Sequence, residues 1–218
     1  MDRTVYEAYL RILKQELVPA MGCTEPIAVA YAAAVAAREL GVQPEKVDIC
    51  VSGNIIKNVK SVIVPNTGGL HGLSAAAAAG IVAGDPSREL LVISQVTQAQ
   101  KEAIAAFLQQ ADFTVRESDT GALFDICITL SAGDREAACR IAEDHTNIVC
   151  IRRNGETVYC REPAGQSQQI PEEKSLLSVE GIVEFADALD VQDVKEIFDR
   201  QIAYNMAIAE EGMQGNYT

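Results

Sequence analysis

The stretch Met21-Gly22-Cys23-Thr24-Glu25-Pro26 stands directly before an alanine-rich apolar run, residues 27–37, and together they decide the fold. The run predicts a helix that continues to about Leu40 and ends at Gly41, a residue that readily closes a helix. Residues 27–37 would be apolar on every side of that helix, so we expect it to be buried all round. The rest of the chain is therefore expected to be arranged around it.

Cys23 stands at the start of this helix, where its neighbours favour a helix N-terminus. Thr24 suits the N-cap, Glu25 favours the positive end of the helix dipole, and Pro26 is tolerated in a first turn. Unpaired backbone N–H groups at such a place lower the pKa of a thiol and favour the thiolate, which attacks carbon or binds metal. The alternative, a small buried cysteine beside an ordinary helix start, stays open.

The composition indicates a globular chain and argues against two classes of partner. The 218 residues, 48% hydrophobic and 22% charged, can form one large domain or two small ones. A net charge of −13 argues against nucleic-acid binding, which needs a basic face, and against anionic membrane surfaces. The longest apolar runs are too short to span a bilayer.

The N-terminus and the cysteines indicate the compartment. Asp2, Arg3 and Glu7 interrupt any apolar start, so no signal peptide is expected. The six cysteines form no C-x-x-C pair, and several fall in strand-like patterns, which is unlike a secreted disulfide scaffold. We predict a cytoplasmic protein with reduced thiols.

Two polar, glycine-containing turns are predicted near the buried helix. The first covers residues 52–60, after a strand at 47–52, and the second covers residues 65–72. Such turns expose backbone N–H groups to an anion, but neither fits a nucleotide-binding motif. The other elements predicted here are a helix at 4–17 with a Thr4/Glu7 capping box, a short strand at 61–64 and a buried helix at 73–83.

The middle of the chain predicts a self-contained subdomain. Its order, βαββαβ with one extra strand, resembles a ferredoxin-like unit, and Asn154-Gly155 is a strong hairpin signal. The predicted elements are strands at 90–96, 112–117, 123–130, 146–152 and 157–161, with helices at 98–110 and 134–143.

The last part of the chain predicts a linker at 162–175 and helices at 178–189 and 191–211. Val194, Phe198, Ile202 and Met206 recur every four residues on the second helix and have no obvious partner. We therefore expect either the N-terminal part of a longer protein or an obligate oligomer. The predicted class is α+β, with alanine-rich buried helices packed on short strands. The expected division is residues 1–86, an inserted subdomain at 87–162, and residues 163–218.

Several separated motifs resemble the L-cysteine desulfidase family, also described as serine dehydratase alpha-chain-like. They are Met21 to Pro26, Ser52-Gly53-Asn54 with Lys57-Asn58, Val64-Pro65-Asn66-Thr67-Gly68, His145-Thr146-Asn147-Ile148-Val149, and the tail 205–212. The resemblance follows the chain in order over essentially its whole length, although family members are about twice as long.

The resemblance implies a bacterial or archaeal cytoplasmic lyase with an oxygen-sensitive [4Fe–4S] cluster. Such an enzyme eliminates sulfide from L-cysteine, giving pyruvate and ammonia, and the related serine dehydratases eliminate water. Cys23 matches the family's N-terminal cysteine, a proposed cluster ligand, and the other proposed ligands lie in a C-terminal half beyond residue 218. One thiolate cannot hold a four-iron cluster. This chain alone is therefore expected to be inactive and metal-free, and to need a missing C-terminal half, a partner subunit or a second copy.

The candidate site residues come from the two polar turns and the Cys23 stretch. Lys57 and Lys60 are candidates for the base at Cα or for a carboxylate clamp, and His71 for a proton shuttle. The candidate substrate contacts are Thr24, Glu25, Asn54, Asn58, Asn66, Thr67 and Gly68. Solvated lysines, turn geometry and helix capping remain the alternative roles. His145 is expected at a strand edge that faces the cleft, with no assigned mechanism.

A second interpretation is a regulatory or amino-acid-binding module without catalysis. An enzyme needs the Cys23 thiol to face an open cleft beside residues 52–60 and 65–72, whereas a sensor module does not. The sequence leaves open whether cysteine or serine is the substrate.

Overall fold

A computed structural model describes residues 1–161 and 173–215. Its residues form two compact units. The larger unit spans Ala20–Pro163, and the smaller one combines Met1–Pro19 with the C-terminal segment that begins at Ala164. No described helix is both long enough and apolar enough to cross a membrane.

The centre of the larger unit is a pair of buried helices, α2 (Thr24–Leu40) and α4 (Gly72–Ala83). α2 is buried on all sides over its middle turns and closes at Gly41, whose φ of 72° is the left-handed conformation that glycine favours. A Cβ added to Gly80 of α4 would lie 2.0 Å from the carbonyl oxygen of Ala30 in α2. The two helices therefore pack backbone against backbone, as their alanine-rich sequences allow.

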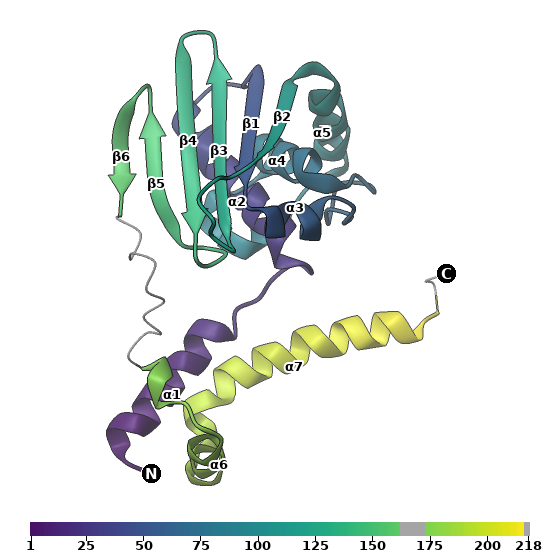
Figure 1. Ribbon diagram of the computed structural model, residues 1–218. Helices are drawn as coiled ribbons and strands as arrows, with labels where there is room; N and C mark the ends of the chain where they lie inside the picture. The colour runs from purple at the N-terminus through teal and green to yellow at the C-terminus, as the bar shows by residue number, and fades with distance from the viewer. Residues whose placement is uncertain (162–172, 216–218) are drawn as a thin grey trace. The chain divides into compact units, whose positions relative to one another are not determined.

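One mixed sheet of six strands packs against this helix pair (Figure 1). The strand order is β2-β1-β3-β4-β5-β6, with β1 parallel to β2 and antiparallel to β3, and antiparallel pairing from β3 to β6. The strands are β1 (Lys46–Val51), β2 (Asp112–Glu117), β3 (Asp125–Ala132), β4 (Arg135–Ala142), β5 (Ile148–Arg153) and β6 (Glu156–Cys160).

The two faces of the sheet differ in chemistry because side chains alternate along each strand. The inner face carries buried apolar residues such as Ile49, Ile128 and Ile141 and packs on α2 and α4. The outer face is defined by Cys50, Cys127, Thr129, Ala138, Arg140, Cys150, Arg152 and Cys160.

The remaining elements of this unit surround the helix pair. They are α3 (Gly53–Val59), the 3-10 helix η1 (Pro86–Leu91) and α5 (Gln98–Gln110). α5 begins with a Thr97/Gln100 capping box, and its Phe107 ring packs edge-on against Phe113 of β2. These contacts hold α5 beside the edge strand β2.

The smaller unit consists of α1 (Arg3–Glu16), η2 (Lys174–Leu176), α6 (Val179–Ala188) and α7 (Val191–Met213). The rings of Tyr6 and Tyr9 both lie 5.2 Å from that of Phe185 in α6. The hydroxyl of Tyr6 donates to Asp193 at 2.7 Å, and that of Tyr9 donates to the carbonyl of Leu176. These aromatic contacts join the two ends of the sequence into one unit.

Most predicted elements are confirmed. Helices near 4–17, 24–40, 73–83, 98–110, 178–189 and 191–211 and strands near 47–52, 112–117, 123–130, 146–152 and 157–161 all appear within a few residues. Asn154-Gly155 forms the β5–β6 hairpin turn, with positive φ at both residues. The predicted linker at 162–175 lies mostly outside the described residues.

Several local predictions are wrong. Residues 134–143 form strand β4 instead of a helix, residues 90–96 form η1 and turns instead of a strand, and 61–64 makes only a single bridge between Ile63 and His71. Residues 53–59 are helix α3 instead of a turn. The helix caps also differ, because Asp2 caps α1 in place of Thr4, and Cys23, instead of Thr24, occupies the N-cap of α2.

The mixture of helices and strands is confirmed, but a ferredoxin-like subdomain is not. β1, from residues 46–51, lies between β2 and β3 and pairs with both. The sheet therefore crosses the predicted boundary at residue 86, because one of its interior strands, β1, comes from the segment before that boundary.

We predict that Gly80→Ala destabilises the larger unit by about 2–3 kcal/mol, because its methyl group would overlap the Ala30 carbonyl and force α2 and α4 apart. Urea unfolding followed by circular dichroism measures the change. Ser74→Ala, at a half-buried position of the same helix, is the matched control and should change stability by no more than about 0.5 kcal/mol. Equal stability of the two variants would contradict the close packing.

Candidate functional site

A polar cluster surrounds the N-terminus of α2. Gly22 has a φ of 83° and turns the chain into the helix, and Cys23 takes the N-cap position. The Cys23 side chain makes no capping bond to the backbone and is exposed. The thiol instead donates to a side chain of the first turn of α2.

Glu25 connects this thiol to α3. Its Oε2 accepts a hydrogen bond from Cys23 Sγ at 3.1 Å, and its Oε1 accepts one from Asn58 Nδ2 at 3.1 Å. Asn58 is half-buried on α3, in the segment that follows β1. Both carboxylate oxygens are thus held in place, which orients Glu25 toward the thiol.

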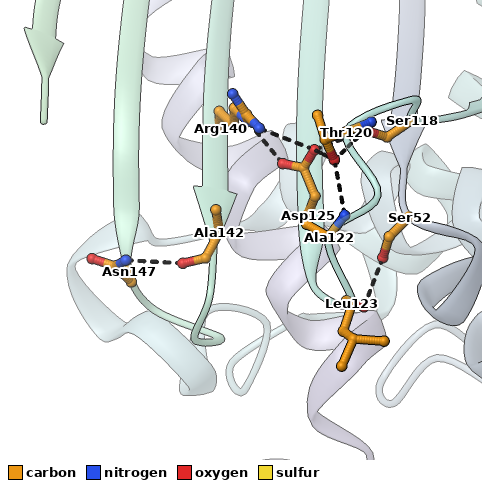
Figure 2. A network of polar contacts seen from close by, with 9 residues as sticks. All are labelled: Ser52, Ser118, Thr120, Ala122, Leu123, Asp125, Arg140, Ala142 and Asn147. Atoms are coloured by element: carbon orange, nitrogen blue, oxygen red, sulfur yellow. Dashed lines mark hydrogen bonds and ion pairs between the residues drawn. The ribbon is translucent and has the colours of Figure 1, made fainter. Parts of the chain in front are cut away.

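His145 completes the cluster from the turn between β4 and β5. Its Nε2 lies 2.9 Å from Thr24 Oγ1, and its ring packs edge-on against Phe124 at 4.6 Å. The turn is held by Asn147, whose Nδ2 donates to the Ala142 carbonyl at 2.9 Å (Figure 2). His145 is therefore held beside the first turn of α2 by contacts on two sides.

A buried ion pair holds the neighbouring loop in place. Asp125, only 2% exposed, accepts hydrogen bonds from Arg140 Nε at 2.8 Å and Nη2 at 3.2 Å. Ser118 and Thr120 donate to the same carboxylate (Figure 2). Because Asp125 follows Phe124 directly, this network also fixes the ring that packs on His145.

Ser52 links the same loop to α3. Its hydroxyl donates to the carbonyl of Leu123 at 3.0 Å (Figure 2), and its backbone N–H donates to the carbonyl of Asp125. Ser52 precedes the helix that carries Asn58. The loop before β3 therefore holds both the helix of Asn58 and the aromatic support of His145.

The electrostatics of Cys23 differ from the sequence prediction. Partial burial raises the pKa of the Cys23 thiol, and the hydrogen bond to the Glu25 carboxylate raises it further. The backbone N–H of Glu25 does lower the pKa of Cys23, as expected at a helix start, but it is outweighed. The predicted lowering of this pKa is therefore wrong, and the protonated thiol is favoured.

Glu25 shows the complementary effect. The hydrogen bond from Cys23 lowers the pKa of Glu25 more than partial burial raises it. The Cys23 thiol therefore donates its proton in a hydrogen bond to the Glu25 carboxylate. If the thiol binds an electrophile or a cation, Glu25 is placed to take up the proton that Cys23 loses.

The structure brings together four of the sequence-predicted site residues, because Cys23, Thr24 and Asn58 all donate hydrogen bonds to the Glu25 carboxylate. Lys57, Lys60 and Asn54 are exposed on or just after α3, and no contact in the described residues joins them to the cluster. Their roles as base, clamp or substrate contact stay predictions.

The second predicted turn uses its polar side chains internally. Asn66 has a φ of 58° and its Nδ2 donates to the carbonyls of Ile93 and Ser94, and Thr67 Oγ1 donates to the carbonyl of Val64 at 2.7 Å. Gly68 is exposed with positive φ, and His71 is an exposed N-cap of α4 without a capping bond. These contacts favour the turn-geometry alternative for Asn66 and Thr67.

His145 is the residue of the cluster that the sequence did not place among the site residues. It lies in a quoted motif, but its approach to Thr24 depends on pairing between β4 and β5, and residues 134–143 read as a helix. A period of two along Ala137, Cys139 and Ile141 was the signal that could have identified the strand.

The described residues contain no group of three or more His, Cys, Asp and Glu side chains arranged to hold a metal ion. The cluster at α2 offers one thiolate, whereas a four-iron cluster is usually held by three or four. These residues by themselves do not fit a [4Fe–4S] group.

Comparison with known proteins gives relatives whose names state no activity. The chain is similar to a UPF0597 protein of Desulfitobacterium hafniense (strain Y51), with 51% identity over 212 residues that cover 97% of this chain and 49% of the relative. UPF0597 proteins of Fusobacterium nucleatum and Treponema denticola are 41% and 38% identical, over 98% and 100% of this chain and 50% and 51% of their own lengths. The chain thus spans about half the length of the curated relatives it matches.

No family model matches the chain, and no solved structure does.

We predict that Glu25→Gln increases the alkylation rate of Cys23 by iodoacetamide at pH 8 about two- to five-fold. The variant removes the carboxylate that raises the pKa of the thiol, so the midpoint of the rate against pH moves to lower pH. Peptide mass mapping distinguishes Cys23 from the other cysteines. Glu39→Gln, at the far end of α2, is the control and should leave the rate unchanged. A slower reaction in Glu25→Gln would contradict the assigned contact.

Proposed function

We propose that this chain supplies the N-terminal part of the active site of a cytoplasmic, iron–sulfur-dependent lyase that acts on L-cysteine or L-serine. The observation that supports it is the polar cluster around an exposed thiol, in which Cys23 donates to Glu25, Asn58 of α3 donates to Glu25, and His145 contacts Thr24. The enzyme interpretation predicts that the Cys23 thiol faces an open cleft beside residues 52–60 and 65–72, and the bond between Glu25 and Asn58 supports the first of these two neighbours.

The reaction is a β-elimination. A base takes the Cα proton, the electron pair forms the Cα–Cβ double bond, and the Cβ–S or Cβ–O bond breaks with its electrons leaving on sulfur or oxygen. The leaving group takes a proton and departs as hydrogen sulfide or water. The remaining aminoacrylate tautomerises to an imine, which one water hydrolyses to pyruvate and ammonia.

The residues of this chain would transfer protons and bind the substrate carboxylate. His145 is assigned to proton exchange with the leaving group, since histidine is the side chain best suited to this near neutral pH. Glu25 would accept the Cys23 proton when the thiolate is used. Asn58 and the first N–H groups of α2 would bind the substrate carboxylate, with Lys57 and Lys60 as candidates for the clamp or the base.

The iron–sulfur cluster would require ligands from outside this chain. Cys23 would be one thiolate ligand, and the cluster, when bound, would supply a Lewis acid at the leaving group. The residues that the structure describes do not fit the group alone.

The test is anaerobic reconstitution of the full-length protein with iron and sulfide, followed by measurement of sulfide release from L-cysteine and pyruvate formation from L-serine. We expect Cys23→Ala to lower kcat/KM about 100-fold or more, and His145→Asn about 10- to 100-fold with a changed pH profile. Cys50→Ala, on the outer face of the sheet, is the control and should remain active. Full activity in Cys23→Ala would reject the proposal.

The matched region covers about half of each relative. We also propose that α7 packs against a segment that corresponds to the other half of these relatives. After Val194 and Ile197, which are buried, α7 exposes a stripe of large apolar side chains on one side. This stripe consists of Phe198, Ile202, Met206 and Met213. A helix face of this kind needs a cover in the complete protein, and the missing length is about that of this chain.

We predict that Ile202→Glu prevents this chain from co-eluting with a co-expressed polypeptide that carries the rest of the full-length sequence. Gln201→Glu, at an exposed position outside the apolar stripe, is the control. This variant should co-elute with the other polypeptide as a 1:1 complex on size-exclusion chromatography. If the chain instead forms a stable dimer that Ile202→Glu dissociates, while the other half never binds, the stripe joins two copies and this assignment is wrong.

A further inference from the structure

A cavity of about 310 Å³ lies on the outer face of the sheet, away from the cluster at α2. Its floor comes from β3, β4 and β5, and its side from β6 and Arg161. This volume is at the small end of the range of ligand pockets, about 300–1,000 Å³. The cavity therefore has room for a small molecule.

The local strand geometry accounts for the hollow. The register shifts between Arg140 and Ile141 where β4 meets β5, and again between Ile151 and Arg152 where β5 meets β6. Such irregularities bend a strand and increase its twist. Two of them on either side of β5 curve this part of the sheet.

The side chains at the cavity form a line across four strands. Cys127 of β3 is opposite Arg140, Arg140 is opposite Cys150, and Cys150 is opposite Cys160 of β6. Residues directly opposite each other in a sheet project from the same face. The cavity is therefore lined by both thiols and guanidinium groups, from Cys127, Cys150, Cys160, Arg140, Arg152 and Arg161.

The charges in this cavity are not balanced. Arg140 is neutralised by Asp125, and Glu136 is the other carboxylate at the cavity. Arg152 and Arg161 make no ion pair with any carboxylate among residues 1–161 and 173–215. The chain has a net charge of −13, so acidic residues outnumber basic ones. Two arginines at one cavity without an ion pair in the described residues therefore do not result from an excess of basic residues.

We propose that this cavity binds a small anion that carries a carboxylate or phosphate group, held by Arg152 and Arg161. The planar guanidinium fork matches the oxygen pairs of both groups and binds them through two parallel hydrogen bonds. The thiols and Ala138 provide small, weakly polar walls for a short ligand body. The site does not depend on the lyase activity proposed above.

Binding is tested by isothermal titration calorimetry of the 218-residue chain with sodium acetate and with inorganic phosphate, at constant ionic strength. We expect saturable binding of at least one anion, and the stronger one identifies the group that the site prefers. The double variant Arg152→Gln/Arg161→Gln should weaken this binding at least 10-fold. Arg153→Gln is the matched control, because Arg153 is the next residue of β5 and pairs with Glu39.

The cysteine in the wall reports where the anion binds. The bound anion should slow alkylation of Cys150 by iodoacetamide and leave Cys23 unaffected, as read by peptide mass mapping. Absence of saturable binding, unchanged affinity in the double variant, or protection of Cys23 in place of Cys150 would each overturn the proposal. If circular dichroism shows that the double variant is unfolded, Arg161→Gln alone, at an exposed position after β6, replaces it.

Discussion

The packing of α4 against α2 is the constraint on which the rest of the larger unit depends. Gly80 and Ala30 meet backbone to backbone, and this close approach leaves α2 enclosed between α4 and the inner face of the sheet. The first turn of α2 then emerges at the end of the sheet where the β4–β5 turn and α3 lie. Glu25 can meet Asn58, and Thr24 can meet His145, only because the helix behind them is held at this depth.

One residue, Arg140, contributes both to the polar cluster at α2 and to the cavity on the outer face of the sheet. Arg140 binds Asp125, which fixes the loop that carries Phe124 and hence the ring of His145. The same guanidinium lies at the outer-face cavity. A buried carboxylate with four donors is costly to leave unpaired, so this contact is held strongly. Two surfaces with different chemistry therefore rely on one ion pair within the sheet.

The sequence predicted the parts of the fold that local patterns determine. The burial of α2, its stop at Gly41, the limits of α5 and the Asn154-Gly155 hairpin follow from periodicity and turn chemistry. The sequence did not predict strand β4, because alanine and cysteine occur in both helices and strands. It did not predict the pairing of β1 with β3, because that pairing joins distant segments. Cys23, Thr24, Glu25 and Asn58 of the cluster were predicted as site residues. The pKa of Cys23 and the approach of His145 depend on neighbours that only the fold supplies.

The placement of β1 between β2 and β3 has a consequence for synthesis on the ribosome. Lys46 pairs with Ser131, so the middle of the sheet cannot close until the chain has been translated beyond β3. Until then α2 and α4, the two alanine-rich helices of this unit, have emerged without the complete sheet that packs on them. Long-range pairing of this kind slows folding and prolongs exposure of apolar surface. We therefore expect the nascent chain to expose its alanine-rich helices to solvent until β3 has been synthesised.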